Sequence, residues 1–483
     1  MSSSPQTPPP VPGQDSDRDA GPAAVSADGA APAAVSWSEA LRFWLKLGFI
    51  SFGGPAGQIA IMHTELVERR RWISDKRFLH ALNYCMLLPG PEAQQLATYL
   101  GWLMHRSAGG IAAGVLFVLP SLLILIALSA AYMAYGDQPL VAGLLYGIKP
   151  AVCAIVLHAA WRVGSRVLRH PLLWGIAAGA FVALAILQLP FVLIVLAAAL
   201  AGWLGGRRWP TVFGGSGGHG GAQAPAKNAA QPAAWIDDDT PTPAHARFSR
   251  ARLLRVLAIG LVLWALPLLL LRAWGEAVLG SPGMLAQMGG FFTQAALLTF
   301  GGAYAVLPFV YQGVVVQHGW LTGPQMITGL ALGETTPGPL IMVVAFVGFV
   351  AAWQSPQMAL LLGRDARLLA GIVAACVATW FTFLPSFLFI LAGGPLVEST
   401  RGQLGFSAPL TGITAAVVGV ILSLALFFGT HVLWPQGLQG PFDVAAALLA
   451  AAAALALLRW KRGVIEVIAA CALAGLLWRT LGP

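Results

Sequence analysis

Five ionisable side chains stand inside apolar stretches of this chain, where a charged group is costly. Lys46 and Lys149 are cations, whereas Glu92, Glu334 and His158 can each gain or lose a proton. A lysine in such a place can compensate the charge of a bound anion, and a carboxyl or imidazole group can carry a coupled proton. Our hypothesis assigns charge compensation to the two lysines and proton coupling to the other three residues.

Each lysine also has a purely structural interpretation. Lys46 follows Arg42 by about one helical turn, so both side chains can extend their charged ends toward a membrane surface. Lys149 has long apolar flanks on both sides, which make such an extension harder, and its structural alternative is an ion pair with Glu92. The sequence leaves both alternatives open.

Glycine and proline interrupt four apolar segments, at 41–62, 80–104, 287–310 and 326–351. In lipid, an interrupted helix is tolerated only where its free backbone groups line a cavity or are buried in protein. A helix that starts after the break presents free N–H groups and a positive dipole end, which suit an anion. A packing kink is the alternative. The motifs are Phe52-Gly53-Gly54-Pro55, Pro89-Gly90-Pro91, Phe300-Gly301-Gly302 and Pro337-Gly338-Pro339.

The interruptions supply a second group of binding candidates. We predict that backbone amides at the breaks contact the oxygens of the substrate, and that Gln94 and Gln95 donate side-chain hydrogen bonds to it. Fixed cations and helix N-termini together favour an anion, and small polar neighbours favour an oxyanion over a large organic acid. The glycines in this group are Gly53, Gly54, Gly90, Gly301, Gly302 and Gly338.

The interrupted segments belong to a skeleton that occurs twice. The offset between the copies is 248 residues from Phe43 and Phe291 onward, and 265 residues by Pro120 and Pro385. The second copy therefore carries 17 additional residues, which we expect in a loop around 352–367. Two repeats with broken helices around a shared site are a signature of secondary transporters. The copies differ chemically, since Leu340 stands at the position of Glu92.

Composition sets the class of protein. Hydrophobic residues make up 57% of the 483 residues and charged residues 10%, whereas soluble domains carry roughly 25% charged residues. We therefore predict an all-α polytopic membrane protein. The net charge of +9 is assigned to membrane topology and not to nucleic-acid binding, because much of the Lys and Arg lies between apolar segments. The four cysteines form no paired motif and HExxH is missing, so we expect no metal, no cofactor and no enzyme.

The distribution of basic residues predicts the topology. Loop 63–80 carries five Lys or Arg residues, whereas the equivalent loop 311–328 carries none. Because basic loops stay in the cytoplasm, the two loops are expected on opposite faces, which means inverted repeats with re-entrant broken helices. The same topology puts the cluster of Arg459, Lys461 and Arg462 on the cytoplasmic face.

The chain divides into five parts. They are a disordered tail at 1–36, a first repeat at 37–205, a flexible linker at 206–252, a connecting helix and loop at 253–284, and a second repeat at 285–483. The tail lacks the basic and apolar regions of a cleaved signal. Tail and linker are rich in small, polar and proline residues, and both are expected in the cytoplasm.

At these motifs the chain resembles the chromate transporter family in its long, two-repeat form. The resemblance covers about 37–205 and 285–480. It rests on Phe52-Gly53-Gly54-Pro55, the basic loop ending at Trp72, Leu88-Pro89-Gly90-Pro91 with Gln94 and Gly101, and the equivalent motifs Phe300-Gly301-Gly302 and Pro337-Gly338-Pro339 of the second half. It implies a multi-pass inner-membrane transporter that exports chromate at the expense of the proton motive force and confers chromate resistance. Sulfate is the structural analogue of chromate. The second half departs from the pattern at Ala303, the counterpart of Pro55.

The residues alone leave other functions open. A sulfate uptake permease and an anion channel fit the same charges and the same breaks. The expected partners are chromate, sulfate, protons and the lipid bilayer, without nucleic acid. Assembly as a homodimer is also left open by the sequence.

Overall fold

Helices joined by short connections make up the structure, a computed structural model that describes residues 32–52, 54–213, 233–241, 243–300, 302–399 and 407–481. The first half contains α1 (Trp37–Ile50), α2 (Gly54–His63), η1 (Thr64–Arg69), α3 (Asp75–Leu87), α4 (Glu92–Tyr135), α5 (Pro139–Val167), α6 (Pro171–Ala185) and α7 (Phe191–Arg208). The middle contains α8 (Pro210–Phe213), η2 (Ala244–Ala246) and α9 (Arg250–Leu279).

The second half repeats this order of helices. It contains α10 (Met284–Leu297), α11 (Ala303–Tyr311), η3 (Gln312–Gln317), α12 (Gly323–Thr335), η4 (Leu340–Met342), α13 (Val343–Gln354), α14 (Pro356–Leu362), η5 (Arg364–Ala366), α15 (Arg367–Ser399), α16 (Ser407–Leu433), α17 (Val444–Leu458) and α18 (Val464–Leu481). Among the described residues, seven helices are long and apolar enough to cross a membrane, or eight if the bent pair around Ser355 counts as one span. The chain is an all-α polytopic membrane protein.

The duplicated skeleton of the sequence is also a duplicated backbone. Helices α3 and α12 are both 13 residues long and occupy equivalent positions, and η1 and η3 are equivalent π-helices of 6 residues. Each π-helix is closed by a backbone bond of 2.8 Å, from Trp72 N to the Leu66 carbonyl and from Trp320 N to the Val314 carbonyl. The wider turn of a π-helix was not foreseeable from the sequence.

The extra residues of the second half lie where the first half has a sharp bend. In α4 the backbone leaves helical geometry at His105 and Arg106, and the chain folds back so that Gly101 contacts Gly109. In the second half α14 and η5 occupy the equivalent place between α13 and α15. The expected loop around 352–367 is therefore mostly a short helix and a single helical turn.

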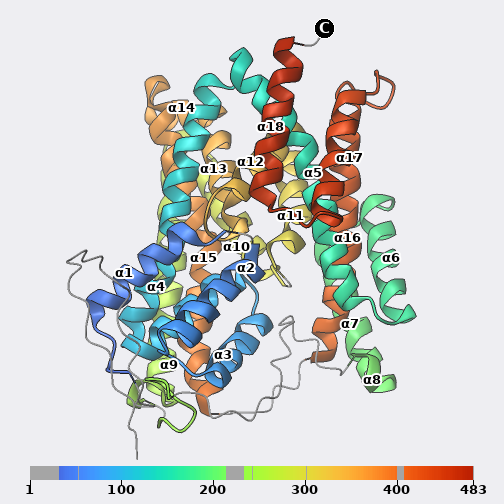
Figure 1. Cartoon of the computed structure of the whole chain (residues 1–483). Coiled ribbons are helices and arrows are strands. Elements are labelled where there is room, and N and C mark those ends of the chain that lie inside the picture. Colours follow the sequence, from blue (N-terminus) through green and yellow to red (C-terminus); the bar gives the residue numbers. More distant parts are fainter. Residues whose placement is uncertain are drawn as a thin grey trace, which may run out of the picture.

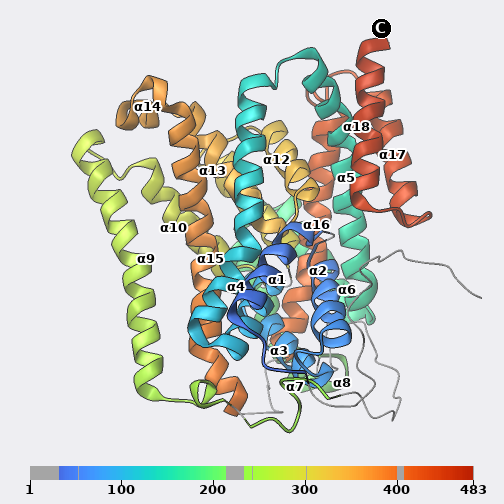
Figure 2. The ribbon, with the colours of Figure 1, turned by 60° about the vertical axis from the view of Figure 1, so that its left-hand side comes forward.

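Short helices of the two halves lie at different levels of the molecule. Figure 1 and Figure 2 show α1, α2 and α3 in the lower part and α12, α13 and α14 in the upper part, while α9 runs between the two levels. Hairpin α6–α7 lies low and hairpin α17–α18 lies high. Their first helices have 15 residues each, or about 22 Å, too short to cross a hydrocarbon core of roughly 30 Å.

Figure 2 shows the α17–α18 turn, which carries Arg459, Lys461 and Arg462, near half height and away from the lower end of the molecule. The expected placement of this basic cluster on the cytoplasmic face stays a prediction.

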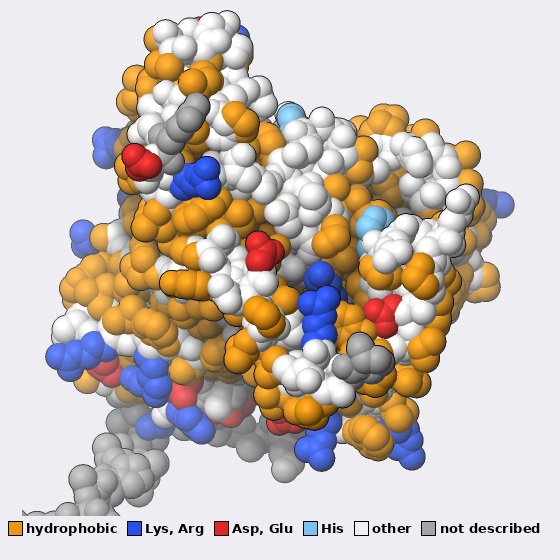
Figure 3. Space-filling view, turned by 90° about the horizontal axis from the view of Figure 1, so that it is seen from above, with side chains coloured by type: hydrophobic (Ala, Val, Ile, Leu, Met, Phe, Trp, Pro, Cys, Tyr) orange, Lys and Arg blue, Asp and Glu red, His pale blue; other side chains and the backbone are white. Residues whose placement is uncertain are grey.

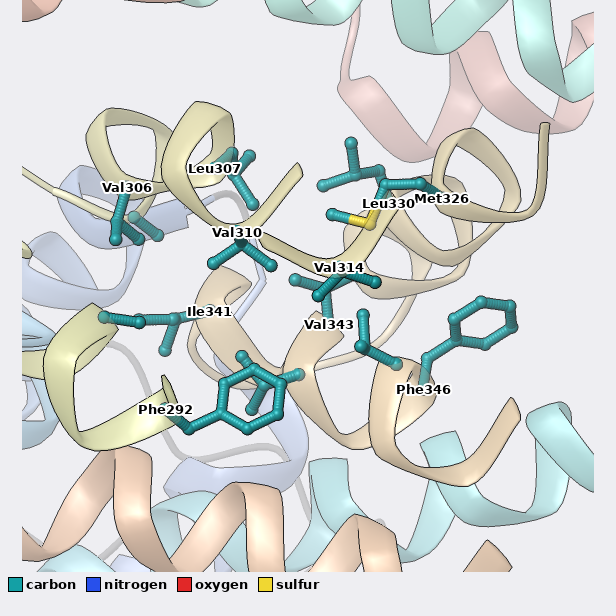
Figure 4. Packing of buried hydrophobic residues seen from close by; sticks show 14 of the residues in the cluster. Phe292, Val306, Leu307, Val310, Val314, Met326, Leu330, Ile341, Val343 and Phe346 are labelled. Carbon is teal, nitrogen blue, oxygen red and sulfur yellow. The ribbon is translucent and has the colours of Figure 1, made fainter. Parts of the chain in front are cut away.

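Apolar packing encloses the broken helices of the second half. Figure 4 shows Phe292, Val310, Met326, Ile341 and Phe346 packed together, and each of them is at most 1% exposed. These residues come from α10, α11, α12, η4 and α13, so all parts of the broken unit share one core. Burial of large apolar side chains on this scale fixes the relative positions of the short helices, which are too short to be stable alone.

Part of the expected flexible linker is packed against the first half. In the strap, defined as residues 233–241 and 243–249, Ile236 N donates to the Trp72 carbonyl at 3.1 Å, and Ser74 Oγ donates to Asp238 at 2.6 Å. His245 Nε2 lies 3.0 Å from the Trp102 carbonyl, and burial lowers the pKa of this imidazole. The prediction of a flexible linker is wrong for the strap, because its apolar residues Ile236 and Ala246 are buried. Residues 214–232 and 1–31 lie outside the described ranges.

Candidate functional site

The breaks of the two halves bind each other directly. Gly90 N donates to the Thr299 carbonyl at 2.7 Å, and Gly338 N donates to the Ser51 carbonyl at 2.8 Å. Gly90 and Gly338 are equivalent positions, and so are Ser51 and Thr299. Each Pro-Gly-Pro turn therefore packs against the Phe-Gly-Gly break of the other half. The centre of the molecule is a single unit built from four interrupted helices.

Only glycine fits the middle of each Pro-Gly-Pro turn. Gly90 has φ +125° and Gly338 has φ +104°, values that other residues rarely adopt. A Cβ at Gly90 would lie 2.7 Å from Gln95 Nε2 and would overlap Ser386 Oγ, and one at Gly338 would lie 2.8 Å from the Cβ of Ser121. The flanking prolines, Pro89, Pro91, Pro337 and Pro339, lack an N–H group and stop the preceding helices.

Three buried glutamines surround the breaks. Gln58 Nε2 donates to the Gly338 carbonyl at 2.6 Å, and Gln95 Nε2 donates to the Pro89 carbonyl at 2.7 Å. Gln94 Nε2 donates to Thr98 Oγ1 at 3.0 Å. The Oε1 atoms of all three glutamines are buried without a protein partner. Buried polar atoms are normally satisfied, so unpaired ones at a helix break indicate a place for a ligand or water.

The helices that leave the breaks have free N-termini. No side chain caps α4, α11 or η4, which begin at Glu92, Ala303 and Leu340. At Gly54 and Gly302 an added Cβ would meet nothing within 4 Å, so there is open space beside the starts of α2 and α11. The arrangement offers unpaired backbone N–H groups with adjacent room, as an anion requires. Gly53 and Gly301, between Phe52 or Phe300 and these glycines, lie outside the described residues.

Two carboxyl groups flank the Pro-Gly-Pro turns. Glu92, at the start of α4, is buried and forms no ion pair with any described residue. Glu334, near the end of α12, accepts a hydrogen bond from the Tyr304 hydroxyl. His158 and Arg162 lie one turn apart on α5. Both predicted carboxylates therefore lie beside the breaks, and of the two only Glu334 has a side-chain hydrogen-bond partner among the described residues.

The two lysines lie in different surroundings. Lys149 lines a cavity of about 340 Å³, here called the upper cavity, together with Asp137 and Arg479. It makes no ion pair with Glu92, so the structural alternative for Lys149 is wrong. Lys46 is exposed on α1, on the same side as the exposed Leu45 and Phe49. That position favours the membrane-surface interpretation of Lys46.

Several residues of the site were not predicted from the sequence. Gln58 could have been predicted, because it is a polar residue within the first broken segment. The repeated Leu-Pro-Ser motif likewise marked Ser121 and Ser386, which pack against Gly338 and Gly90. Tyr304 and Arg479 gave no usable signal, since their roles depend on which helices become neighbours.

The fold and the breaks define a class of protein. A polytopic helical protein with two repeats, whose interrupted helices meet at the centre, has the architecture of a secondary transporter. The chain belongs to the chromate transporter family, whose family model matches residues 38–203 and 286–476.

Curated relatives agree over most of the length. The chain is 30% identical to a chromate transport protein of Cupriavidus metallidurans, over 90% of this chain and 92% of that protein. It is 32% identical to a chromate transport protein of Pseudomonas aeruginosa, over 81% of each chain. It is 28% identical to a probable chromate transport protein of Synechococcus elongatus, over 82% of this chain and 85% of the relative. No solved structure matches the chain significantly.

Proposed function

We propose that this protein is a secondary transporter that exports chromate across the inner membrane, driven by the proton motive force, and thereby confers chromate resistance. Family membership and the names of the relatives support chromate as the substrate. The interlocked breaks carry the proposal, because they leave unpaired backbone N–H groups and buried amides at the junction of the two halves.

Each group at the centre has a proposed role. The N–H groups near Gly53, Gly54, Gly301 and Gly302 and at the starts of the helices after Gly90 and Gly338 bind substrate oxygens. Gln94 and Gln95 supply side-chain hydrogen bonds. Lys149, which lies in the upper cavity and not at the breaks, compensates the charge of the dianion. Lys46 has a smaller part in charge compensation, in keeping with its exposure.

Glu92 is the proposed carrier of the coupled proton. It is buried beside the break without a cationic partner among the described residues, so a change in its protonation is not offset by a fixed ion pair. Glu334, with its Tyr304 hydrogen bond, and His158 are the alternatives.

The repeats are proposed to have inverted topology, with the lower end in the cytoplasm. Five basic residues in loop 63–80 and none in loop 311–328 support this orientation, as do the different levels of α3 and α12. Single cysteines replacing Ser74 and Thr322, in a background without Cys85, Cys153, Cys376 and Cys471, provide the test. An impermeant thiol reagent added outside intact cells should label the Thr322→Cys protein and spare the Ser74→Cys protein, while labelling of both from outside would contradict inversion.

Because Ser74 contacts Asp238, a control is needed for the accessibility of its cysteine. Permeabilised cells serve this purpose, since the Ser74→Cys protein should then react as well. A protein that stays unlabelled after permeabilisation is covered by the strap, and the next exposed loop residue, Lys76→Cys, takes its place.

Flux measurements separate the proposed function from its alternatives. In vesicles of known orientation, labelled chromate should move out of the cytoplasmic side and accelerate with an inward proton gradient. Flux of sulfate in the opposite direction with the same energetic dependence would favour an uptake permease. Flux that depends only on the anion gradient and does not change with the proton gradient would favour a channel.

A further inference from the structure

The upper cavity is lined by two cations, Lys149 and Arg479. Its lining comes from the end of α4, the start of α5, the start of α12 and the end of α18. The polar residues among the lining are Tyr132, Asp137, Tyr146, Lys149, Gln325, Thr328 and Arg479. Figure 3, which views this end of the molecule from above, shows Lys and Arg side chains inside a hollow bordered by apolar surface.

Neither cation has an ion-pair partner among the described residues. No ion pair within 4.0 Å joins Lys149 or Arg479 to a carboxylate in the part of the chain that the structure describes. Asp137 lines the same cavity but contacts neither of them at that distance. Two like charges in one partly enclosed cavity repel each other, and a bound anion between them removes that cost.

The cavity holds Arg479 in a defined place. Its guanidinium lies 5.7 Å from the centre of the Tyr146 ring, and the Tyr146 hydroxyl donates to Asp443 at 2.7 Å. The ring therefore helps to orient the arginine. Asp443 lines a neighbouring cavity together with Tyr146 and Arg479 but forms no ion pair with the arginine within 4.0 Å. The hydroxyls of Tyr132 and Thr328 and the amide of Gln325 add neutral hydrogen-bonding groups to the lining.

We propose that Lys149 and Arg479 together form an oxyanion-binding site in the upper cavity, separate from the central breaks. The site takes a small inorganic dianion of the sulfate or chromate type. Helix α12 connects the two places, since Thr328 and Glu334 lie six residues apart, or about 9 Å along the helix. The upper cavity is a second binding site on the substrate path between the central breaks and the outer solution. This assignment rests on the proposed function and its orientation.

The test measures local charge and does not require transport. Ala142 lines the upper cavity, two turns before Lys149, and Ala142→Cys in the cysteine-free protein provides the reporter. At low ionic strength, the rates of modification by an anionic and by a cationic methanethiosulfonate reagent are compared. Thr322→Cys, exposed outside the cavity at the start of α12, is the reference.

The expected result is a preference for the anionic reagent that is at least tenfold stronger at Ala142→Cys than at Thr322→Cys. Adding Arg479→Gln should reduce that preference about threefold or more, and Arg479→Lys should retain it. Arg272→Gln, which removes an exposed cation paired with Glu276, should leave it unchanged. Sulfate should slow modification of Ala142→Cys in a saturable way, and this protection should be lost with Arg479→Gln.

Equal reagent preference at the two cysteines, or no protection by sulfate, would overturn the site. The same conclusion follows if Arg479→Lys, a folded variant with the charge retained, loses the preference. Failure of the proposed function gives a different pattern, in which the cavity keeps its charge preference and its protection by sulfate while vesicles show no chromate flux.

Discussion

The two halves of this transporter contribute equivalent backbones but unequal side chains at the centre. Gly90 and Gly338 make matching bonds to the opposite half, at 2.7 Å and 2.8 Å. The Pro-Gly-Pro turn of the first half is followed by buried polar side chains. The equivalent stretch after the Pro-Gly-Pro turn of the second half is apolar and buried. The polar residues are Glu92, Gln94, Gln95 and Thr98, and their counterparts are Leu340, Met342, Val343 and Phe346.

This difference separates two requirements. The backbone geometry must be present in both halves, because each Pro-Gly-Pro turn is held by the break of the other half. In the proposed function the side-chain chemistry is needed once, because one substrate and one coupled proton would use a single asymmetric site. The second half acts mainly as a rigid apolar frame, as the packing in Figure 4 illustrates.

The largest expected effect tests the symmetry of the backbone. Gly90→Ala and Gly338→Ala should each reduce chromate transport by roughly tenfold or more, because the positive φ alone costs about 1–3 kcal/mol and the new Cβ overlaps a neighbour. Gly290→Ala, in a helical position with nothing within 4 Å of its Cβ, is the matched control. Initial rates in vesicles, normalised to the amount of folded protein, provide the measurement. A strong effect at only one of the two glycines would disprove the equivalence of the turns.

A second comparison sets the two lysines against each other. Lys149→Gln should lower transport by roughly tenfold or more, because an unpaired cation within the membrane contributes on the order of a few kcal/mol to anion binding. Lys46→Gln should change it by less than about twofold, as expected for an exposed surface position. Kinetics at several chromate concentrations in well-expressed variants measure this. Normal transport by Lys149→Gln would remove the charge-compensation role.

The carboxyl groups are expected to differ in coupling. Glu92→Gln should abolish stimulation of transport by a proton gradient while chromate binding persists, because the neutral amide cannot carry a proton. Glu276→Gln, an exposed residue paired with Arg272, should behave like the unmodified protein. The measurement is flux with and without the gradient, together with chromate binding to purified protein. Unchanged gradient dependence in Glu92→Gln would transfer the role to Glu334 or His158.

The smallest expected effect concerns the strap, which packs against the first half and also contacts α15 of the second half. Asp238→Ala removes contacts to Ser74 at 2.6 Å and Lys76 at 3.4 Å, so the local stability of the strap should fall by about 1 kcal/mol. Tryptic cleavage at Arg69, Arg70 and Arg71 should accelerate a few-fold. Asp239→Ala, at an exposed position beside it, should leave the cleavage rate unchanged. Equal rates for the two variants would show that the strap does not protect this loop.

The sequence by itself determined the class of protein, the duplication and the places where helices break. Those properties are local, since apolar segments form helices in lipid and Pro-Gly-Pro stops them wherever it occurs. Even the equivalent starts of α3 and α12 follow from aligned residues. The family model matches the two stretches of the chain that contain these local motifs.

Tertiary structure decided which breaks meet and which charges share a cavity. The contact of Gly90 with Thr299 joins residues more than two hundred positions apart, and no periodicity encodes it. Lys149 shares a cavity with Arg479 because α18 packs beside α5 through small residues, with Gly147 against Gly475. The positions of the short hairpins and of the strap likewise depend on their packing partners. Hydrophobic burial stabilises contact with any apolar surface of matching shape, so the actual partner is known only from the folded structure.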